Sequence, residues 1–166
     1  MNITCRGTSI ILGLILMLIV GSALAQAGPA TNSRYVIKGD TVYDKETNLS
    51  WQRCSVGQQW VDATGCVGMI KTFDFHTAQQ QGSGTWRVPT KDELPTLVDL
   101  TRKAQEKKPM INEVAFPDMD LKKLWYWTST PAGESGGWYV CFGDGDLFNG
   151  YYEKRPFAVR LVRRGQ

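Results

Sequence analysis

Histidine is almost absent from this sequence, which narrows the chemistry available to it. The chain has 166 residues and one histidine, His76. Zinc sites draw their ligands mainly from histidine and cysteine, and no histidine-based metal motif is present. Nothing singles out a pair of carboxylates for acid–base catalysis either. We therefore predict that the protein is not an enzyme and needs no metal or cofactor.

Long hydrophobic runs are also scarce, and the longest lies at the N-terminus. Arg6 precedes the apolar residues 10–20, and an Ala-Leu-Ala sequence ends at Ala25. This order is typical of a secretory signal peptide, and the run is short for the roughly 20 residues of a membrane-spanning helix. The alternative is an uncleaved anchor. We assign residues 1–25 to a signal peptide and predict a periplasmic or secreted protein with no stable membrane anchor after cleavage.

Cysteines are few, and cleavage after residue 25 would leave three: Cys54, Cys66 and Cys141. An exported protein matures in an oxidising compartment, where disulfides persist. Cys54 and Cys66 are close enough in sequence to close a small loop, which would contribute about 3 kcal/mol by restricting the unfolded chain. We predict a disulfide between them. Cys141 is either a buried free thiol or an intermolecular partner, and its apolar neighbours favour burial.

The charge balance is mild. The formal net charge of +3 falls to +2 on cleavage, because Arg6 is the only charged residue removed. Such a balance argues against a nucleic-acid partner. The remaining chain suits one domain, and we expect a flexible leader over residues 26–34 and a domain over residues 35–166. The oligomeric state stays open.

The first half of this domain reads as short strands followed by a short helix. Two β-type runs surround Gly39 and predict a hairpin over residues 35–44. A third strand is predicted over residues 49–53. A short helix follows within residues 73–84, where Gly82 suits its C-cap.

A second helix is predicted from Lys91. Thr90 and Glu93 have the spacing of a capping box, in which each side chain bonds the other's backbone N–H group. Pro95 removes one backbone donor near the first turn, so we expect a kink there but not loss of the helix. Apolar spacing predicts a buried stripe made of Leu94, Leu97, Val98 and Thr101.

The last third is rich in predicted strands, over residues 124–130, 136–142 and 157–163. Residues 109–124 read as a long irregular connection, and residues 143–156 as a loop. The predicted fold is α+β, with two short helices packed on small antiparallel sheets and long irregular loops.

Aromatic residues gather on two neighbouring predicted strands, three at residues 125–127 and two at residues 138–139. Each ring buries a large area, so most should face the core, although alternation along a strand allows one ring of a pair to point outward. We predict structural roles for Trp51, Trp86, Arg87, Pro89, Trp127 and Trp138. Arg87 in particular should hold an irregular turn by bonding nearby carbonyls.

Asp144, Asp146 and Asn149 place oxygen ligands close together in a glycine-rich stretch. Calcium binding by such a loop is possible, but the stretch lacks the downstream glutamate of an EF-hand. A glycine-rich turn between strands explains it as well. We keep these three residues as ligand-binding candidates and favour the turn.

Basic residues concentrate near the C-terminus, at Lys154, Arg155, Arg160, Arg163 and Arg164. Several on one face would suit sulfate or another anion, since arginine offers paired donors. Alternation along a continuous strand would place Arg160 and Arg164 on one side. The alternative is a solvated strand edge on which basic residues discourage edge-to-edge pairing.

Five segments in order resemble a known family: TVYDKETNLSWQRCSVGQ, WRVPTKDEL, FPDMD with YWTST, GGWYVCFGDGD and VRLVRRGQ. They are similar to the C-terminal domain of Legionella collagen-like (Lcl) adhesins. The resemblance implies a C-type-lectin-like fold and an exported, often surface-associated module, and the adhesin itself is associated with sulfated glycans. The sequence has no collagen-like Gly-x-y repeat, so trimer formation is not implied.

These observations predict an exported, non-catalytic binding module of the bacterial envelope or surface. Its ligand would be a glycan or polyanion, held by residues 109–124 and the 143–150 region, because loops on a rigid scaffold carry function. A periplasmic protein-binding or inhibitory partner is the alternative. An enzyme similar to formylglycine-generating enzymes is a lesser one, for which Cys141 is the only candidate thiol.

Overall fold

The computed structural model describes residues 33–134, 136–150 and 154–165. The predicted signal peptide over residues 1–25 and residues 26–32 of the predicted leader lie outside this range. The leader was predicted to reach Arg34, and this boundary is wrong. The Arg34 guanidinium pairs with the buried Asp44 carboxylate at 2.5 Å and donates to the Thr96 carbonyl oxygen at 2.7 Å. Arg34 therefore belongs to the folded domain.

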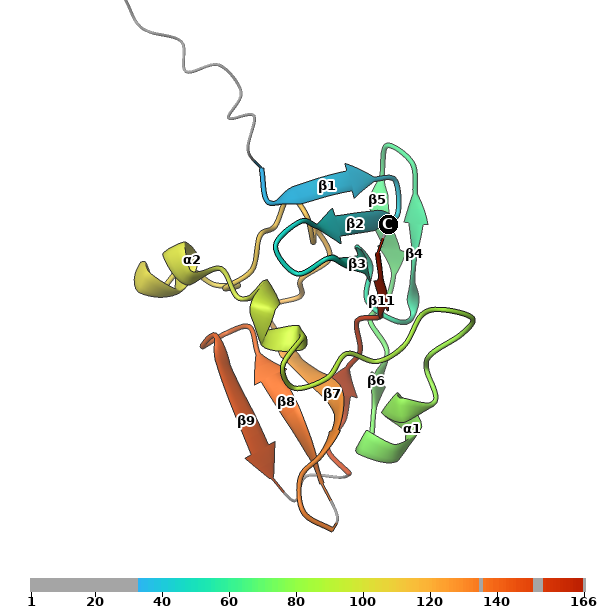
Figure 1. Ribbon diagram of the computed structural model, residues 1–166, viewed down its shortest axis with the longest axis vertical. Coiled ribbons are helices and arrows are strands. Elements are labelled where there is room, and N and C mark those ends of the chain that lie inside the picture. The colour runs from blue at the N-terminus through green and yellow to red at the C-terminus, as the bar shows by residue number, and fades with distance from the viewer. Residues whose placement is uncertain (1–32, 135, 151–153, 166) are drawn as a thin grey trace, which may run out of the picture. The chain divides into compact units, whose positions relative to one another are not determined.

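Among the described residues, the strands form three sheets (Figure 1). The first is antiparallel, in the order β1-β2-β3-β11. Gly39 has a φ of 55°, which glycine adopts without strain, and closes the β1–β2 hairpin that the sequence predicts. The strands of this sheet are β1 (Tyr35–Lys38), β2 (Thr41–Asp44), β3 (Leu49–Gln52) and β11 (Val162–Arg164).

The second sheet has five strands, in the order β6-β10-β7-β8-β9. Its β10–β7 pairing is parallel, so the sheet is mixed where an antiparallel one was predicted. Residues 146–150, predicted as part of a loop, form the edge strand β9. The strands are β6 (Thr72–Phe73), β7 (Trp125–Pro131), β8 (Gly137–Cys141), β9 (Asp146–Gly150) and β10 (Phe157–Ala158). The third sheet is a hairpin of β4 (Gln58–Val61) and β5 (Gly65–Gly68).

Residues 157–163 do not form the single strand that the sequence predicts. They are divided between β10 in the five-stranded sheet and β11 in the four-stranded sheet. Residues 159–161 cross from one sheet to the other and are buried. This crossing places Arg160 inside the domain, where alternation along one strand would have placed it on the surface.

The first helix, α1 (Phe75–Gln79), begins at an Asp74 N-cap whose side chain accepts from the Thr77 backbone N–H. It ends before Gly82, so the predicted glycine C-cap is wrong. A Cβ atom at Gly82 would lie 2.8 Å from the Trp86 carbonyl oxygen. Glycine is needed there because two backbone segments approach closely.

The predicted second helix is broken into two short pieces. The capping box forms, since the Thr90 N–H donates to the Glu93 carboxylate at 2.8 Å and the Glu93 N–H donates back to the Thr90 hydroxyl at 3.3 Å. Pro95 then lies in a single 3₁₀ turn, η1 (Leu94–Leu97), and Val98 is extended with ψ 122°. Val98 pairs instead with Ile111.

A new helix, α2 (Leu100–Ala104), starts after Asp99, whose carboxylate accepts from the Arg102 N–H. It buries none of its residues, and Thr101 is exposed although it was predicted to share the buried stripe. The helix does not continue through Asp99, because the Asp99 backbone N–H donates to the distant Met110 carbonyl oxygen at 3.0 Å. The α+β class is nevertheless confirmed, with α1 supplying the buried helical residues Phe75 and Ala78.

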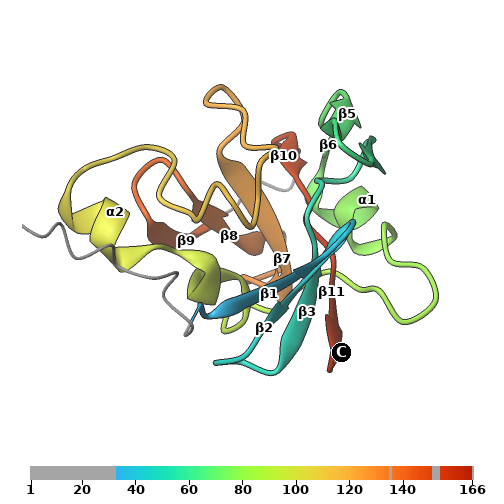
Figure 2. The same cartoon turned by 90° about the horizontal axis from the view of Figure 1, so that it is seen from above.

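The five-stranded sheet separates two hydrophobic clusters. In the view of Figure 2, β7 lies between α1 on one side and α2 on the other. Tyr126 and Val140 contribute to the first cluster, while Trp127 and Tyr139 contribute to the second. Side chains alternate across a strand, so neighbours on β7 and β8 reach opposite faces. As a result, β7 and β8 are the most buried strands of this sheet, and its outer strands lie nearer the surface.

The residues predicted to be structural occupy structural places. Trp51 and Trp127 are fully buried, and the Trp127 indole donates to the Phe73 carbonyl oxygen at 2.8 Å. Arg87 was predicted to bond nearby carbonyls, but its main partner is the Glu93 carboxylate, to which it donates two hydrogen bonds at 2.6 and 2.7 Å, while it donates one longer bond to the Val88 carbonyl oxygen at 3.3 Å. The other three make contacts of their own. Trp86 packs against the second cluster, and the backbone carbonyl of the buried Pro89 accepts from the Ser129 N–H. The half-buried Trp138 lies beside Lys91.

Candidate functional site

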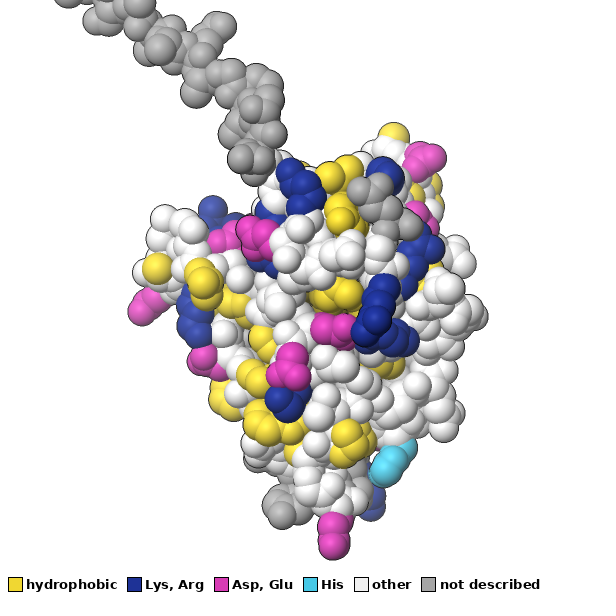
Figure 3. Space-filling view, viewed as in Figure 1, with side chains coloured by type: hydrophobic (Ala, Val, Ile, Leu, Met, Phe, Trp, Pro, Cys, Tyr) yellow, Lys and Arg dark blue, Asp and Glu magenta, His cyan; other side chains and the backbone are white. Residues whose placement is uncertain are grey.

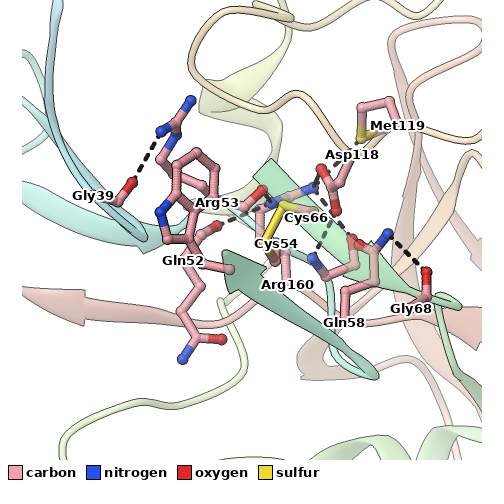
Figure 4. Close-up of a disulfide and its surroundings, with 12 residues drawn as sticks. Gly39, Gln52, Arg53, Cys54, Gln58, Cys66, Gly68, Asp118, Met119 and Arg160 are labelled. Carbon is pink, nitrogen blue, oxygen red and sulfur yellow. Dashed lines mark hydrogen bonds and ion pairs between the residues drawn. A yellow bond between two sulfur atoms is a disulfide. The ribbon is translucent and has the colours of Figure 1, made fainter. Parts of the chain in front are cut away.

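The predicted disulfide is confirmed. The Cys54 and Cys66 sulfur atoms are bonded at 2.06 Å, across a sequence separation of 12 residues (Figure 4). The bond joins the chain just after β3 to strand β5, and so fixes the β4–β5 hairpin to the four-stranded sheet. This fits an extracytoplasmic location.

Arg160 is fully buried beside this disulfide (Figure 4). Its guanidinium lies 2.5 Å from the Asp118 carboxylate and also donates to the Gln52 and Arg53 carbonyl oxygens. Burial disfavours its charge, but the Asp118 carboxylate outweighs burial and raises the pKa of Arg160. Arg160 is therefore a structural cation, and the expectation that it would meet a ligand anion is wrong.

Asp118 connects the Arg160 network to Ser55 and, through it, to Tyr126. Its second carboxylate oxygen accepts from the Ser55 N–H at 2.6 Å, and the Ser55 hydroxyl lies 2.8 Å from the Tyr126 hydroxyl. Burial raises the pKa of Tyr126 to about 12. Residues 109–124, predicted as a binding loop, thus supply much of the interior, including Ile111 and Phe116.

The other arginines of the C-terminal segment are dispersed. The Arg163 guanidinium lies 4.6 Å from the Trp86 ring centroid. Arg164 is exposed beside Asp92 and Glu93, so it does not share a side with Arg160. Lys and Arg side chains alternate with acidic ones across the face in Figure 3. The segment therefore builds no single basic surface on the described residues.

The acidic candidates face lysines. Asp146 pairs with Lys103 at 2.5 Å, and Asp144 lies 3.5 Å from Lys108. Asn149 is exposed on β9, opposite Trp138. The part of the chain that the structure describes contains no group of three or more potential metal-ligating His, Cys, Asp or Glu side chains. Asp144 lies in the turn between β8 and β9, as the turn interpretation predicts.

A pocket of about 390 Å³ lies where strands β7 and β10 begin. Its apolar lining consists of Trp125, Tyr139, Pro156 and Phe157. Trp125 is 37% exposed, whereas its neighbour on the same strand face, Trp127, is fully buried. Part of the Trp125 ring is thus exposed to solvent. The volume of the pocket is that of a small-molecule site.

The Trp125 ring is held by its neighbours. It stacks on the Phe157 ring with centroids 5.7 Å apart and an interplanar angle of 21°. Tyr139 and Phe148 contact it at 5.5 and 5.7 Å. Phe157 in turn contacts the buried Trp127 ring at 4.6 Å. The Trp125 ring is therefore held in place by its aromatic neighbours. The protein would lose little side-chain entropy when a ligand contacts this ring.

Cations surround this aromatic platform. Lys122 and Lys123 precede β7 and Arg155 precedes β10, and all three line the pocket together with Thr72. The Lys123 ammonium donates to the Ile70 carbonyl oxygen at 2.8 Å, which fixes its position. None of the lining residues that the structure describes is an aspartate or glutamate. The pocket combines an aromatic surface with positive charge, which suits an anionic ligand with an apolar face.

Arg155 was predicted as a ligand candidate, but the other residues that line this pocket were not. Three segments far apart in the sequence, around residues 72, 122–125 and 155–157, meet only through the β6-β10-β7 strand order. The available signal was the pair of short motifs Lys-Lys-Leu-Trp and Arg-Pro-Phe, each with cations next to an aromatic residue.

Two features bear on catalysis. Cys141 is a buried free thiol, as predicted, and burial raises its pKa, so the reactive thiolate is disfavoured. Residues 133–137 match the Gly-x-Ser-x-Gly pattern of hydrolase nucleophiles, but the pattern falls in the sequence between the end of β7 and the start of β8, which are antiparallel, and its Ser135 lies outside the described residues. The hydrolase elbow joins a strand to a helix. Neither feature builds a catalytic constellation on the described residues.

Within the described residues, none of the helices has the length and hydrophobicity needed to span a membrane.

Fold and site together define a small, disulfide-bonded α+β domain with a preformed aromatic and basic pocket. The sequence model of the Lcl C-terminal domain family matches residues 40–163. The chain belongs to this family, a domain of bacterial surface adhesin-like proteins that is typically non-catalytic. No curated protein matches the chain.

Proposed function

We propose that the protein is an exported, non-catalytic binding module of the bacterial envelope or surface, and that its ligand is a glycan or polyanion held in the Trp125 pocket. The observation that carries the proposal is a partly exposed tryptophan ring, fixed by aromatic neighbours and flanked by Lys122, Lys123 and Arg155. Sugars present apolar faces that pack on aromatic rings, and lysine and arginine bond acidic substituents.

Membership of a family of adhesin-like surface domains supports a binding role, and the disulfide supports export. The predicted signal peptide agrees with both. The pocket replaces the C-terminal basic cluster as the binding site, because Arg160 is buried and Arg163 and Arg164 lie elsewhere.

A glycan array tests the proposal, using purified residues 26–166 together with two variants. Wild-type protein is expected to bind a subset of acidic glycans. Trp125→Ala is expected to weaken binding at least about tenfold, equivalent to about 1.4 kcal/mol. Leu121→Ala is the matched control, because Leu121 is 63% exposed near the same strand but does not line the pocket. Circular dichroism checks that both variants fold.

The protein-partner alternative is decided by the same material. Capture from envelope extract that is unaffected by Trp125→Ala, together with an array on which no glycan binds, would replace the glycan proposal with a protein partner.

A further inference from the structure

We infer that the protein lies reversibly on the surface of an anionic phospholipid membrane, through the face that surrounds the Trp125 pocket. This goes beyond the proposed function, because it concerns contacts outside the pocket and needs no glycan inside it. The membrane face is formed by three segments, residues 69–72, 120–125 and 154–157, each of which contributes to the pocket lining.

Contacts between described residues hold the three segments together. The Lys123 ammonium donates to the Ile70 carbonyl oxygen at 2.8 Å, which ties the chain before β7 to the chain before β6. Phe157 of β10 pairs in register with Phe73 of β6. In Figure 2 the chain before β7, strand β10 and the β4–β5 hairpin, which Met69 directly follows, all lie toward the top of the view. The three segments therefore share one side of the domain.

Exposed apolar side chains gather on this face. Met69 is 82% exposed, Leu121 63% and Trp125 37%, and they are three of the seven large hydrophobic side chains exposed among the described residues. The turn that carries Leu121 is fixed, because the Asp120 carboxylate accepts from the Lys122 N–H at 2.9 Å. Aliphatic tips beside an indole ring suit the boundary between lipid headgroups and acyl chains.

Cations outnumber carboxylates on this face and beside it. Residues 69–74, 120–125 and 151–157 hold five cations and three carboxylates, a formal net charge of +2. The cations are Lys71, Lys122, Lys123, Lys154 and Arg155, and the carboxylates are Asp74, Asp120 and Glu153. The count includes Glu153, which lies outside the described residues, so it holds whichever partner Arg155 has. The chain after residue 25 also carries +2, so its remainder is neutral overall, and an anionic membrane attracts this side of the domain.

The kinds of residue on the face favour a membrane over a protein partner. Four of the five cations are lysines, and lysine is depleted in protein–protein interfaces, where arginine is enriched. Two lysines, Lys122 and Lys123, stand between Leu121 and Trp125 in the sequence, so the exposed apolar side chains form no continuous patch. Separate apolar tips among lysines can each enter the headgroup region while the ammoniums meet lipid phosphates.

Co-sedimentation with lipid vesicles tests the inference, using purified residues 26–166. The probes are vesicles of phosphatidylcholine mixed equally with phosphatidylglycerol, and vesicles of phosphatidylcholine alone. The protein should bind the anionic vesicles at least about tenfold more tightly than the neutral ones. Raising the salt from about 0.1 to about 1 M shortens the Debye length from about 10 to about 3 Å, and should remove most of this difference.

One pair of variants tests the charge. Lys122→Gln/Lys154→Gln should weaken binding to the anionic vesicles at least about tenfold, since each lysine near such a surface changes the affinity about fivefold. Lys45→Gln/Lys107→Gln is the charge-matched control, because both lysines are exposed and lie outside the face. The control should change the affinity less than about threefold.

A second pair tests the apolar side chains. Met69→Ser/Leu121→Ser should weaken binding to the anionic vesicles at least about fivefold and leave glycan binding unchanged, because neither residue lines the pocket. Leu100→Ser/Val114→Ser is the control, because these side chains are 74% and 73% exposed and lie outside the three segments. Circular dichroism checks that every variant folds.

Each contrary result has a separate meaning. Equal binding of neutral and anionic vesicles, or binding that both face variants leave unchanged, would overturn the inference. Folded protein that binds glycan through Trp125 but no vesicle would overturn the inference and leave the proposed function standing. Vesicle binding without any glycan binding would overturn the proposed function alone. Without vesicle binding, a protein captured from envelope extract by the wild type but not by Met69→Ser/Leu121→Ser would replace the membrane with a protein partner.

Discussion

The buried ion pair between Arg160 and Asp118 is the feature whose loss should cost the most stability. Both side chains are 0% exposed, and the two charged groups are 2.5 Å apart. Asp118→Asn keeps the shape of the side chain but removes its charge, leaving the Arg160 cation in the interior without its counter-ion. Removing one partner of a buried pair costs about 3–5 kcal/mol, because the remaining charge is still desolvated.

The same range follows from the contacts. Asp118 accepts from the Arg160 guanidinium and from the Ser55 N–H, and hydrogen bonds to charged groups contribute about 1.5–3 kcal/mol each. Asparagine has one acceptor oxygen, so its amide N–H₂ group must face one of these donors. A loss of about 3–5 kcal/mol is a large share of the 5–15 kcal/mol that stabilises a typical domain.

Urea unfolding at pH 7, followed by tryptophan fluorescence, measures this loss. Asp146→Asn is the matched control, because the Asp146–Lys103 pair has the same separation of 2.5 Å but its carboxylate is 54% exposed. The control should lose no more than about 1 kcal/mol. The double variant Asp118→Leu/Arg160→Met should recover part of the loss, since it removes both charges. A loss in Asp118→Asn equal to that of the control would refute the argument that burial makes this pair different.

Three further predictions concern the cysteines and the response to acid. Replacing both disulfide cysteines, Cys54→Ser/Cys66→Ser, should lower the free energy of unfolding by about 3 kcal/mol in urea titrations, because the closed loop is short, and should leave ligand binding at the Trp125 pocket intact; an unchanged midpoint would contradict this. Cys141 is 3% exposed, so a thiol reagent should label it only after denaturation, and rapid labelling of native protein would contradict its burial. Burial raises the pKa of Glu93, but the hydrogen bonds from Arg87 and Thr90 outweigh burial and hold that pKa below its usual value. The stabilisation that ionised Glu93 provides is therefore fully present above its unfolded pKa of about 4.3, and it is lost as the pH falls through the lower folded pKa. Glu93→Gln should therefore lower the stability at pH 7, and the difference in stability from the wild type should disappear in acid. A difference that persisted in acid would show that the charge of Glu93 is not what stabilises the turn.

Local patterns in the sequence predicted the features that depend on near neighbours. The hairpin at Gly39, the capping box between Thr90 and Glu93 and the disulfide between Cys54 and Cys66 each involve residues separated by at most 12 positions. Such features need only local backbone geometry and a short loop, and they form as predicted.

Other predictions failed because a tertiary partner competed with the local pattern. Val98 continues an apolar helical stripe, but it pairs with Ile111 and ends the helix there. Side-chain alternation along a single strand would place Arg160 on the surface. The chain instead leaves one sheet at Ala158 and enters another at Val162. The alternation rule holds within one strand and says nothing about a residue between two sheets.

The sequence by itself determined that the chain forms an α+β domain with a disulfide between Cys54 and Cys66. Its motifs, in their order along the chain, are those of the Lcl C-terminal domain family. Only the tertiary structure decided which basic residues face solvent together. Lys122, Lys123 and Arg155 come from segments more than 30 positions apart, and the parallel pairing of β10 with β7 brings them to one pocket. The same crossover buries Arg160, because a chain that passes between two sheets carries its side chains into the space that the sheets enclose.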